Sequence, residues 1–151
     1  MSRVVIISGY FNPLHVGHLD YIESAKKLGD SLIVIVNNEA QVELKGSVPF
    51  MKEEDRLRIV KSIKDVNQAV LSIDVGRSVI ETLKQQYNRL SVDPFIDEII
   101  FGNGGDRTEG NSPEEEFCKE VGIRTVYGVG GDKTRSSSTL ISISKGKDND
   151  D

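Results

Sequence analysis

The sequence predicts an α/β fold, a single Rossmann-like, doubly wound sheet of about five parallel strands with helices on both faces. Short apolar runs alternate with segments of helical periodicity along a chain of 151 residues. Runs such as 32–36 lack polar alternation, which is typical of strands covered on both faces. No internal repeat or linker interrupts this order. We therefore expect one domain over residues 1–144 and a polar tail over 145–151.

Five apolar runs have the length of strands. They are residues 4–8, 32–36, 69–73, 98–101 and 124–129. Between them, the periodicity predicts helices near residues 19–28, 52–64 and 78–90, from 113 onward and from about 137. Gly29 is expected to end the first helix, since glycine favours the left-handed conformation found there. Ser78 and Ser112 are predicted N-caps, and Pro113 after Ser112 is typical of a first helical position.

Composition narrows the function classes. The formal net charge of -5 argues against a protein that coats DNA or RNA. The longest apolar runs are strand-length, so no membrane-spanning helix is expected, and the apolar part of the N-terminus is too short for a secretory signal. A single cysteine, Cys118, excludes an intrachain disulfide framework and a Cys-rich zinc site. We expect a cytoplasmic protein without nucleic-acid or membrane partners.

Both histidines of the chain, His15 and His18, lie just after the first predicted strand. Ligands of doubly wound sheets bind beyond the carboxyl ends of strands, and a helix N-terminus favours phosphate. Histidines three residues apart at a helix start project from one side, and Gly17 between them lets a ligand approach the backbone. An isolated pair of this kind is more often one cap and one core residue. The position at the strand exit favours a phosphate site.

The segment 9–18 resembles the H-x-G-H signature of the cytidylyltransferase-like nucleotidyltransferases. That superfamily includes glycerol-3-phosphate cytidylyltransferase, the heptose-phosphate adenylyltransferase domain and archaeal FAD synthetase. Further segments resemble family motifs in the expected order: 18–30, 32–39, 44–46 with 54–56, 104–106 and 136–141. The resemblance therefore covers nearly the whole chain.

The resemblance implies roles for individual residues. Those implied to be catalytic are His15, His18, Lys45 and Arg135. Those implied to bind the nucleotide are Gly9, Tyr10, Phe11, Asn12, Gly17, Gly104, Asp106, Arg107, Ser137, Ser138 and Thr139. Those implied to bind the second substrate are Asn37 and Arg56. These implied roles agree with the chemistry of the side chains, because long cationic side chains and hydroxyl groups at a helix start can bind phosphates.

Three positions depart from the family pattern. Asn12 stands where the family often has Asp, and a neutral amide is a weaker ligand for a divalent ion. No protein side chain is therefore assigned to metal, and Mg²⁺ is expected to be held by phosphates and water. Ser142 stands where Arg or Lys is common, so Arg135 or Lys133 would supply that charge. Residues 64–67 match the R-Y-V-D segment of cytidylyltransferases only loosely.

The resemblance implies transfer of a nucleoside monophosphate from CTP, or from ATP, to a phosphate or phosphonate monoester with release of pyrophosphate. An adenylyltransferase acting on heptose phosphate, FMN or phosphopantetheine is the alternative. A nucleotide sensor without catalysis is an alternative of another class, and measured pyrophosphate release separates it from the enzymes. Small members of the family are often homodimers, so a homodimer is expected.

Overall fold

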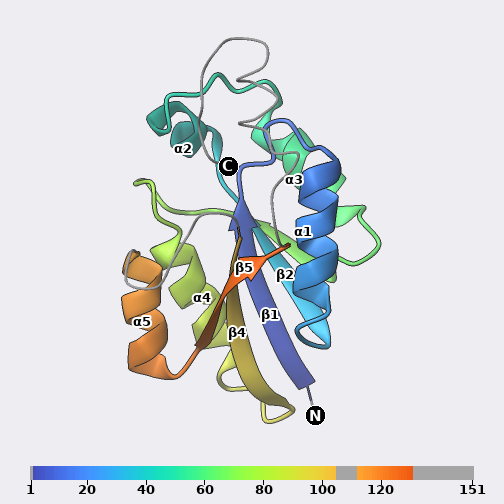
Figure 1. Cartoon of the computed structure of the whole chain (residues 1–151). Coiled ribbons are helices and arrows are strands. Elements are labelled where there is room, and N and C mark those ends of the chain that lie inside the picture. The colour runs from blue at the N-terminus through green and yellow to red at the C-terminus, as the bar shows by residue number, and fades with distance from the viewer. Residues whose placement is uncertain (1, 105–111, 131–151) are drawn as a thin grey trace.

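The computed structural model describes residues 2–104 and 112–130 (Figure 1). The elements in chain order are β1 (Ser2–Gly9), α1 (Val16–Lys26), β2 (Ser31–Val36), α2 (Glu39–Leu44), α3 (Glu53–Lys61), β3 (Gln68–Leu71), α4 (Ile80–Leu90), β4 (Ile96–Gly104), α5 (Pro113–Val121) and β5 (Arg124–Val129). All five predicted strands are present, and the fifth has the predicted bounds. β4 extends to Gly104, because Gly102 and Gly104 pair with Val126 and Val129 of β5. Residues 102–104, which follow the strand predicted over 98–101, therefore also belong to the strand.

The five strands form one parallel sheet in the order β3-β2-β1-β4-β5, which confirms the predicted fold class. The chain winds outward from β1 through β2 to β3 and then returns to place β4 on the other side of β1. β1 and β4 therefore flank the point where the winding direction reverses. Ligands of such sheets bind in the crevice beyond the carboxyl ends of these strands.

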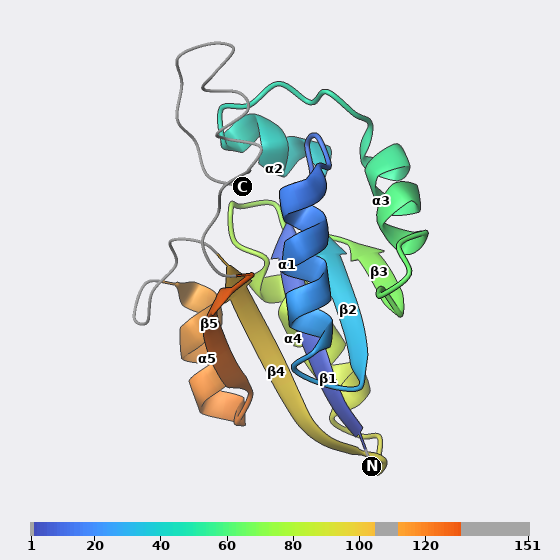
Figure 2. The ribbon, with the colours of Figure 1, turned by 45° about the vertical axis from the view of Figure 1, so that its right-hand side comes forward.

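Two apolar layers cover the sheet, one on each face. Successive residues of β1 point to opposite faces, so Val5 packs in one layer and Ile6 in the other. α1 and α3 lie over the first face, and α4 and α5 lie over the second (Figures 1 and 2). This arrangement brings the N-terminal ends of α1 and α4 to the same edge of the sheet, on opposite sides of it.

The structure confirms one of the three predicted helix-end residues and corrects the other two. Ser112 is the N-cap of α5 as predicted, and its side chain accepts a hydrogen bond from Glu115 N. Gly29 does not end α1, because the C-cap is Lys27. A Cβ on Gly29 would lie 2.7 Å from the carbonyl oxygen of Arg3, so the glycine permits close approach to β1 instead.

Ser78 is not the N-cap of α4, which is Val79, although its hydroxyl accepts from Ile80 N at 3.0 Å. The short helix α2 was not predicted. Its capping box, formed by Asn38 and Gln41, is a signal that the sequence does contain. The helix predicted near Ser137 and the tail 145–151 lie outside the described residues. Among residues 2–104 and 112–130, no helix is long and apolar enough to cross a membrane.

Candidate active site

His15 ends the loop between β1 and α1, and His18 lies in the first turn of α1, beyond the carboxyl end of the strand where the winding of the sheet reverses. Figure 1 shows this connection between β1 and α1. The loop is tightly shaped. Phe11 adopts a left-handed φ of 51°, which is uncommon for a bulky residue, and the peptide bond between Asn12 and Pro13 is cis. The Phe11 ring is fully buried in the core and contacts the His18 ring edge-on, with 5.0 Å between centroids. A contact of Phe11 with a nucleotide would therefore come from its backbone.

The two histidines cap the first turn of α1 reciprocally. His15 is the N-cap, and its Nδ1 accepts a hydrogen bond from Gly17 N at 3.0 Å. In return, His18 Nδ1 accepts from His15 N at 3.2 Å. A nitrogen that accepts carries no proton, so in the neutral rings the proton lies on Nε2, on the side of the ring away from these caps. Each ring therefore has an N–H donor while it holds the helix start.

This helix start is suited to an anion. The centroids of the His15 and His18 rings are 4.1 Å apart, so the two donors belong to one small site. The first turn of α1 contains no acidic residue. The positive end of the helix dipole favours phosphate, and the two imidazoles add donors beside it. His18 is only 5% exposed, so it is also a packed residue of the fold.

The side chain of Asn12 is turned toward the chain segment that precedes α3. Its Nδ2 donates to the carbonyl oxygen of Val48 at 2.8 Å, and its Oδ1 accepts from Phe50 N at 2.8 Å and Met51 N at 3.3 Å. Asn12 is 4% exposed. Sequence reasoning assigned it to the nucleotide, whereas the structure gives its amide to the protein backbone.

Arg56 and Asn37, predicted to bind substrate, are also buried and joined to each other. Arg56 is 1% exposed, and its Nη1 donates to the carbonyl oxygens of Tyr10 at 2.7 Å and Asn37 at 2.6 Å. Burial lowers the pKa of Arg56 from its ordinary value, because the charged form loses its hydration. Three glutamates oppose that shift: Glu53, Glu39 and Glu54. The guanidinium therefore holds the exits of β1 and β2 together.

Lys45, predicted to be catalytic, is the C-cap of α2 and lies at the same edge. Its Nζ is 4.3 Å from the centroid of the Tyr10 ring, a cation–π contact. Tyr10 directly follows β1, so this cation is near the loop that carries the histidines. The structure thus brings His15, His18, Tyr10 and Lys45 to one end of the sheet.

Gly104 ends β4 beside α1. A Cβ there would lie 2.8 Å from the Tyr21 ring, so only glycine fits between the strand and the helix. Six further predicted site residues lie outside the described residues: Asp106, Arg107, Arg135, Ser137, Ser138 and Thr139. Their assigned roles stay predictions.

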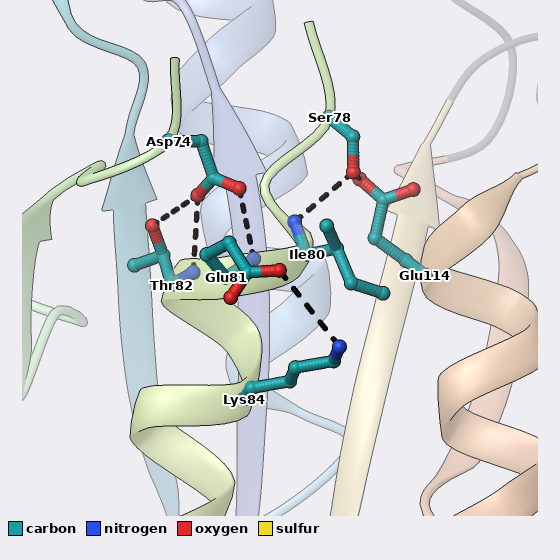
Figure 3. A network of polar contacts seen from close by, with 7 residues as sticks. All are labelled: Asp74, Ser78, Ile80, Glu81, Thr82, Lys84 and Glu114. Carbon is teal, nitrogen blue, oxygen red and sulfur yellow. Dashed lines mark hydrogen bonds and ion pairs between the residues drawn. The ribbon is translucent and has the colours of Figure 1, made fainter. Parts of the chain in front are cut away.

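Two buried carboxylates at the start of α4 were not found from the sequence (Figure 3). Asp74 accepts from the backbone N of Glu81 at 2.8 Å and of Thr82 at 3.0 Å, and from the Thr82 hydroxyl at 2.5 Å. Glu114 accepts from Val79 N at 2.9 Å and from the Ser78 hydroxyl at 3.0 Å. Both carboxylates lie near the first turn of α4, but Asp74 comes from the preceding loop and Glu114 from α5. The sequence pattern of α4 itself therefore did not reveal them.

The residues were tested for a fit to the metal ion that the resemblance implies. Within residues 2–104 and 112–130, no group of three His, Cys, Asp or Glu side chains could hold a metal ion. The one amide oxygen considered as a ligand, Asn12 Oδ1, already accepts two backbone hydrogen bonds. The described side chains therefore do not form a metal site of their own.

Comparison with known proteins identifies the family. The cytidylyltransferase-like family matches residues 6–136. The FAD synthase of Methanocorpusculum labreanum is 45% identical over 123 residues, which cover 79% of this chain and 80% of that protein. The FAD synthase of Archaeoglobus profundus is 41% identical over 96 residues, which cover 62% of this chain and 61% of that protein. Several such relatives are matched over less than two thirds of their length, between 57% and 63%.

A solved structure agrees with the sequence comparisons. The lipopolysaccharide core biosynthesis protein from Thermoplasma volcanium superposes with a TM-score of 0.65 at 25% identity, over 84% of this chain and 96% of that one. The order of strands, the paired histidines at the exit of β1 and the extent of these matches lead to one assignment. The chain belongs to the cytidylyltransferase-like family.

Proposed function

We propose that the protein is an FMN adenylyltransferase, which transfers AMP from ATP to FMN and releases pyrophosphate. The observation that carries the proposal is the likeness to proteins named FAD synthase, which extends over four fifths of one of them. FMN adenylylation is one of the alternatives that the sequence suggested, whereas the main expectation was transfer from CTP, which the loose match of residues 64–67 already weakened. The preference for CTP is therefore replaced by a preference for ATP.

The reaction needs positioning and charge stabilisation more than covalent chemistry. A phosphate oxygen of FMN attacks the α-phosphorus of ATP in line. The new bond joins this oxygen to the α-phosphorus, while the bond from the α-phosphorus to the bridging oxygen breaks and its electrons leave with pyrophosphate. Negative charge grows on the leaving oxygens as this bond lengthens.

The first turn of α1 supports this chemistry. His15 and His18 cap a helix start without acidic residues, where their imidazoles would donate hydrogen bonds to the developing negative charge. Lys45 would approach the phosphates from the end of α2. Mg²⁺ is proposed to accompany the triphosphate, held by phosphate and water oxygens, and to neutralise part of its charge.

A sugar phosphate is the second candidate acceptor. It is favoured by the structural likeness to the lipopolysaccharide core biosynthesis protein of Thermoplasma volcanium. The chemistry at the α-phosphorus is the same for both acceptors. The two candidates therefore differ only in the part of the site that contacts the acceptor beyond its phosphate.

A matrix of substrates tests the proposal. The purified chain is incubated with Mg²⁺ and each of ATP and CTP, in combination with FMN, heptose 1-phosphate and glycerol 3-phosphate. Pyrophosphate release and the nucleotide product are measured by enzymatic coupling and chromatography. FAD formation from ATP and FMN, well above every other pair, is the expected result. Efficient turnover of ATP with the heptose phosphate but not with FMN would favour the second candidate.

The oligomeric state and the compartment belong to the same proposal. We propose a homodimer, on the likeness to small members of the family, and location in the cytoplasm, where ATP and FMN are available. Light scattering across micromolar concentrations measures the mass. A monomeric mass throughout would contradict the dimer without affecting the proposed reaction.

A further inference from the structure

The segment Val48–Met51, between α2 and α3, is attached to the loop that carries the histidines. All three hydrogen bonds of the Asn12 side chain go to this segment: one donated to Val48, and two accepted from Phe50 and Met51. These bonds link residues 36 to 39 positions apart in the chain. Figure 2 shows the segment between α2 and α3 passing close to the start of α1.

A second contact supports the same attachment. Arg56 Nε donates to the carbonyl oxygen of Met51 at 3.4 Å, while its Nη1 donates to Tyr10. Asn12 and Arg56 are both at least nine-tenths buried, so these bonds are shielded from competing water. The position of the segment relative to His15 and His18 is therefore determined by side-chain hydrogen bonds.

The side chains that the segment presents to solvent are apolar. Val48 is 59% exposed and Phe50 is 50% exposed, next to a loop in which Phe11 and Asn12 are buried. Lys45 lies a few residues before them, in contact with the Tyr10 ring. An apolar surface with an aromatic ring and one cation, placed beside a phosphate-binding helix start, suits a flat aromatic compound that carries a phosphate.

We propose that Asn12 is a positioning residue, which holds Val48–Met51 as one wall of the acceptor site, with Phe50 against the aromatic ring of the acceptor. This inference rests on the proposed function for the identity of the acceptor. Asparagine suits this position because one side chain both donates to Val48 and accepts from two N–H groups. Aspartate accepts but does not donate, so it would keep only part of the attachment.

The experiment compares Asn12→Ala and Asn12→Asp with Asn67→Ala as control. Asn67 also accepts two hydrogen bonds, from Leu32 N and Lys26 Nζ, but at the other end of the sheet. Amide hydrogen exchange of the peptide covering residues 47–52 reports the attachment without any ligand. Binding of FMN, by its fluorescence, and of ATP, by calorimetry, reports the two substrate sites separately in the full-length chain.

In Asn12→Ala, we expect exchange of the 47–52 peptide to rise on the order of tenfold, and FMN affinity to fall by a similar factor. ATP affinity and exchange in β4 should change less than twofold, roughly as in Asn67→Ala. Asn12→Asp should give intermediate values, because the bonds from Phe50 and Met51 remain. If Asn12→Ala does not fold, Asn12→Asp alone decides.

Unchanged exchange in the 47–52 peptide would overturn the attachment. Faster exchange with unchanged FMN affinity would contradict the assignment of the segment as a wall of the acceptor site. An equal loss of ATP and FMN affinity would instead assign Asn12 to the nucleotide site. If the unmodified protein does not bind FMN, the proposed function fails together with the assignment of the wall to a flavin. The exchange rates still decide the attachment by themselves in that case.

Discussion

Helices α1 and α4 are both eleven residues long and both begin at the carboxyl edge of the sheet, but their first turns are capped by opposite chemistry. The start of α4 is occupied by carboxylates. Asp74 accepts from two backbone N–H groups and Glu114 from a third, and the Ser78 hydroxyl accepts from a fourth. Negative charge from the protein itself therefore satisfies this helix dipole (Figure 3).

The start of α1 is capped by neutral rings. His15 and His18 accept from Gly17 N and His15 N with their Nδ1 atoms, and no acidic residue occurs in the first turn. The positive end of this dipole is not neutralised by a carboxylate of its own turn. A helix start that is filled with carboxylates repels phosphate, whereas the positive end of a helix dipole without them attracts it. The difference favours α1 over α4 as the helix proposed to bind the nucleotide.

The largest expected effect comes from removing an imidazole while keeping the cap. His18→Gln places an oxygen at the position usual for a capping box, so it can still accept from His15 N. Turnover should fall on the order of a hundred- to a thousand-fold, because one donor to the developing charge is lost. Steady-state pyrophosphate release, corrected for the folded fraction by thermal melting, measures this.

Burial of His18 adds a condition to that test. From its place at a helix start, the sequence predicts that His18 is partly exposed and contributes little packing, but the side chain is 5% exposed and contacts the Phe11 ring. His18→Ala should therefore also lower the melting temperature, and His18→Gln should lower it less. A variant that melts early but keeps normal turnover per folded molecule would make His18 a structural residue only.

The second effect concerns the start of α4. Asp74→Ala leaves the N–H groups of Glu81 and Thr82 without their acceptor, which should cost about 1–3 kcal/mol of unfolding free energy. Turnover per folded molecule should be retained, because this helix start is filled by protein groups. Urea unfolding gives the stability change, and Glu81→Ala is a control that removes an exposed side chain of the same turn. A loss of turnover comparable to that of His18→Gln would contradict the contrast between the two helices.

The third prediction concerns a carboxylate placed at the start of α1, where α4 already has carboxylates. His15→Asp puts a good N-cap at the helix start, so stability should be kept, but its charge opposes phosphate. ATP affinity should fall about 5- to 30-fold, corresponding to about 1–2 kcal/mol of dipole and charge interaction. His15→Asn has nearly the same shape without the charge and serves as the matched control. Equal ATP affinity in the two variants, by calorimetry, would show that charge at this position does not matter.

The smallest expected effect is on the pH dependence of stability and concerns Cys118 in α5, the helix that also contains Glu114. Burial raises the pKa of Cys118 to about 12, with smaller contributions from Glu114 and Glu115. The folded protein thus keeps the thiol proton above pH 9, where the unfolded chain loses it. This contribution to stability is complete below pH 9 and declines toward pH 12, by up to about 1.4 kcal/mol per pH unit.

Cys118→Ala should flatten this decline, although it also removes buried volume. The measurement is the difference between unfolding free energies at pH 8 and pH 10, for the wild type and the variant. Tyrosines and lysines titrate in both proteins and cancel in the comparison. Identical pH slopes would mean that the thiol is more accessible than its position in α5 implies.

The strands, their parallel arrangement and the place of the histidines were predictable from the sequence alone. Unalternating apolar runs define buried strands, and the alternation of strands with helical segments leaves few topologies. The H-x-G-H pattern is local, so its position after β1 followed directly from the sequence. The capping box of α2 is equally local, but the helix was not predicted because it has only six residues.

The partners of buried polar groups were decided only by the tertiary structure. The sequence assigned Asn12 and Arg56 to ligand binding, but burial obliges each to form hydrogen bonds with groups that the fold brings near. Those partners come from other loops, up to 46 residues away for Arg56. No local pattern encodes such pairs, because they depend on how the loops close over the edge of the sheet. Sequence therefore determined where the two histidines lie relative to the sheet, and packing decided which buried polar side chains bond to the protein itself.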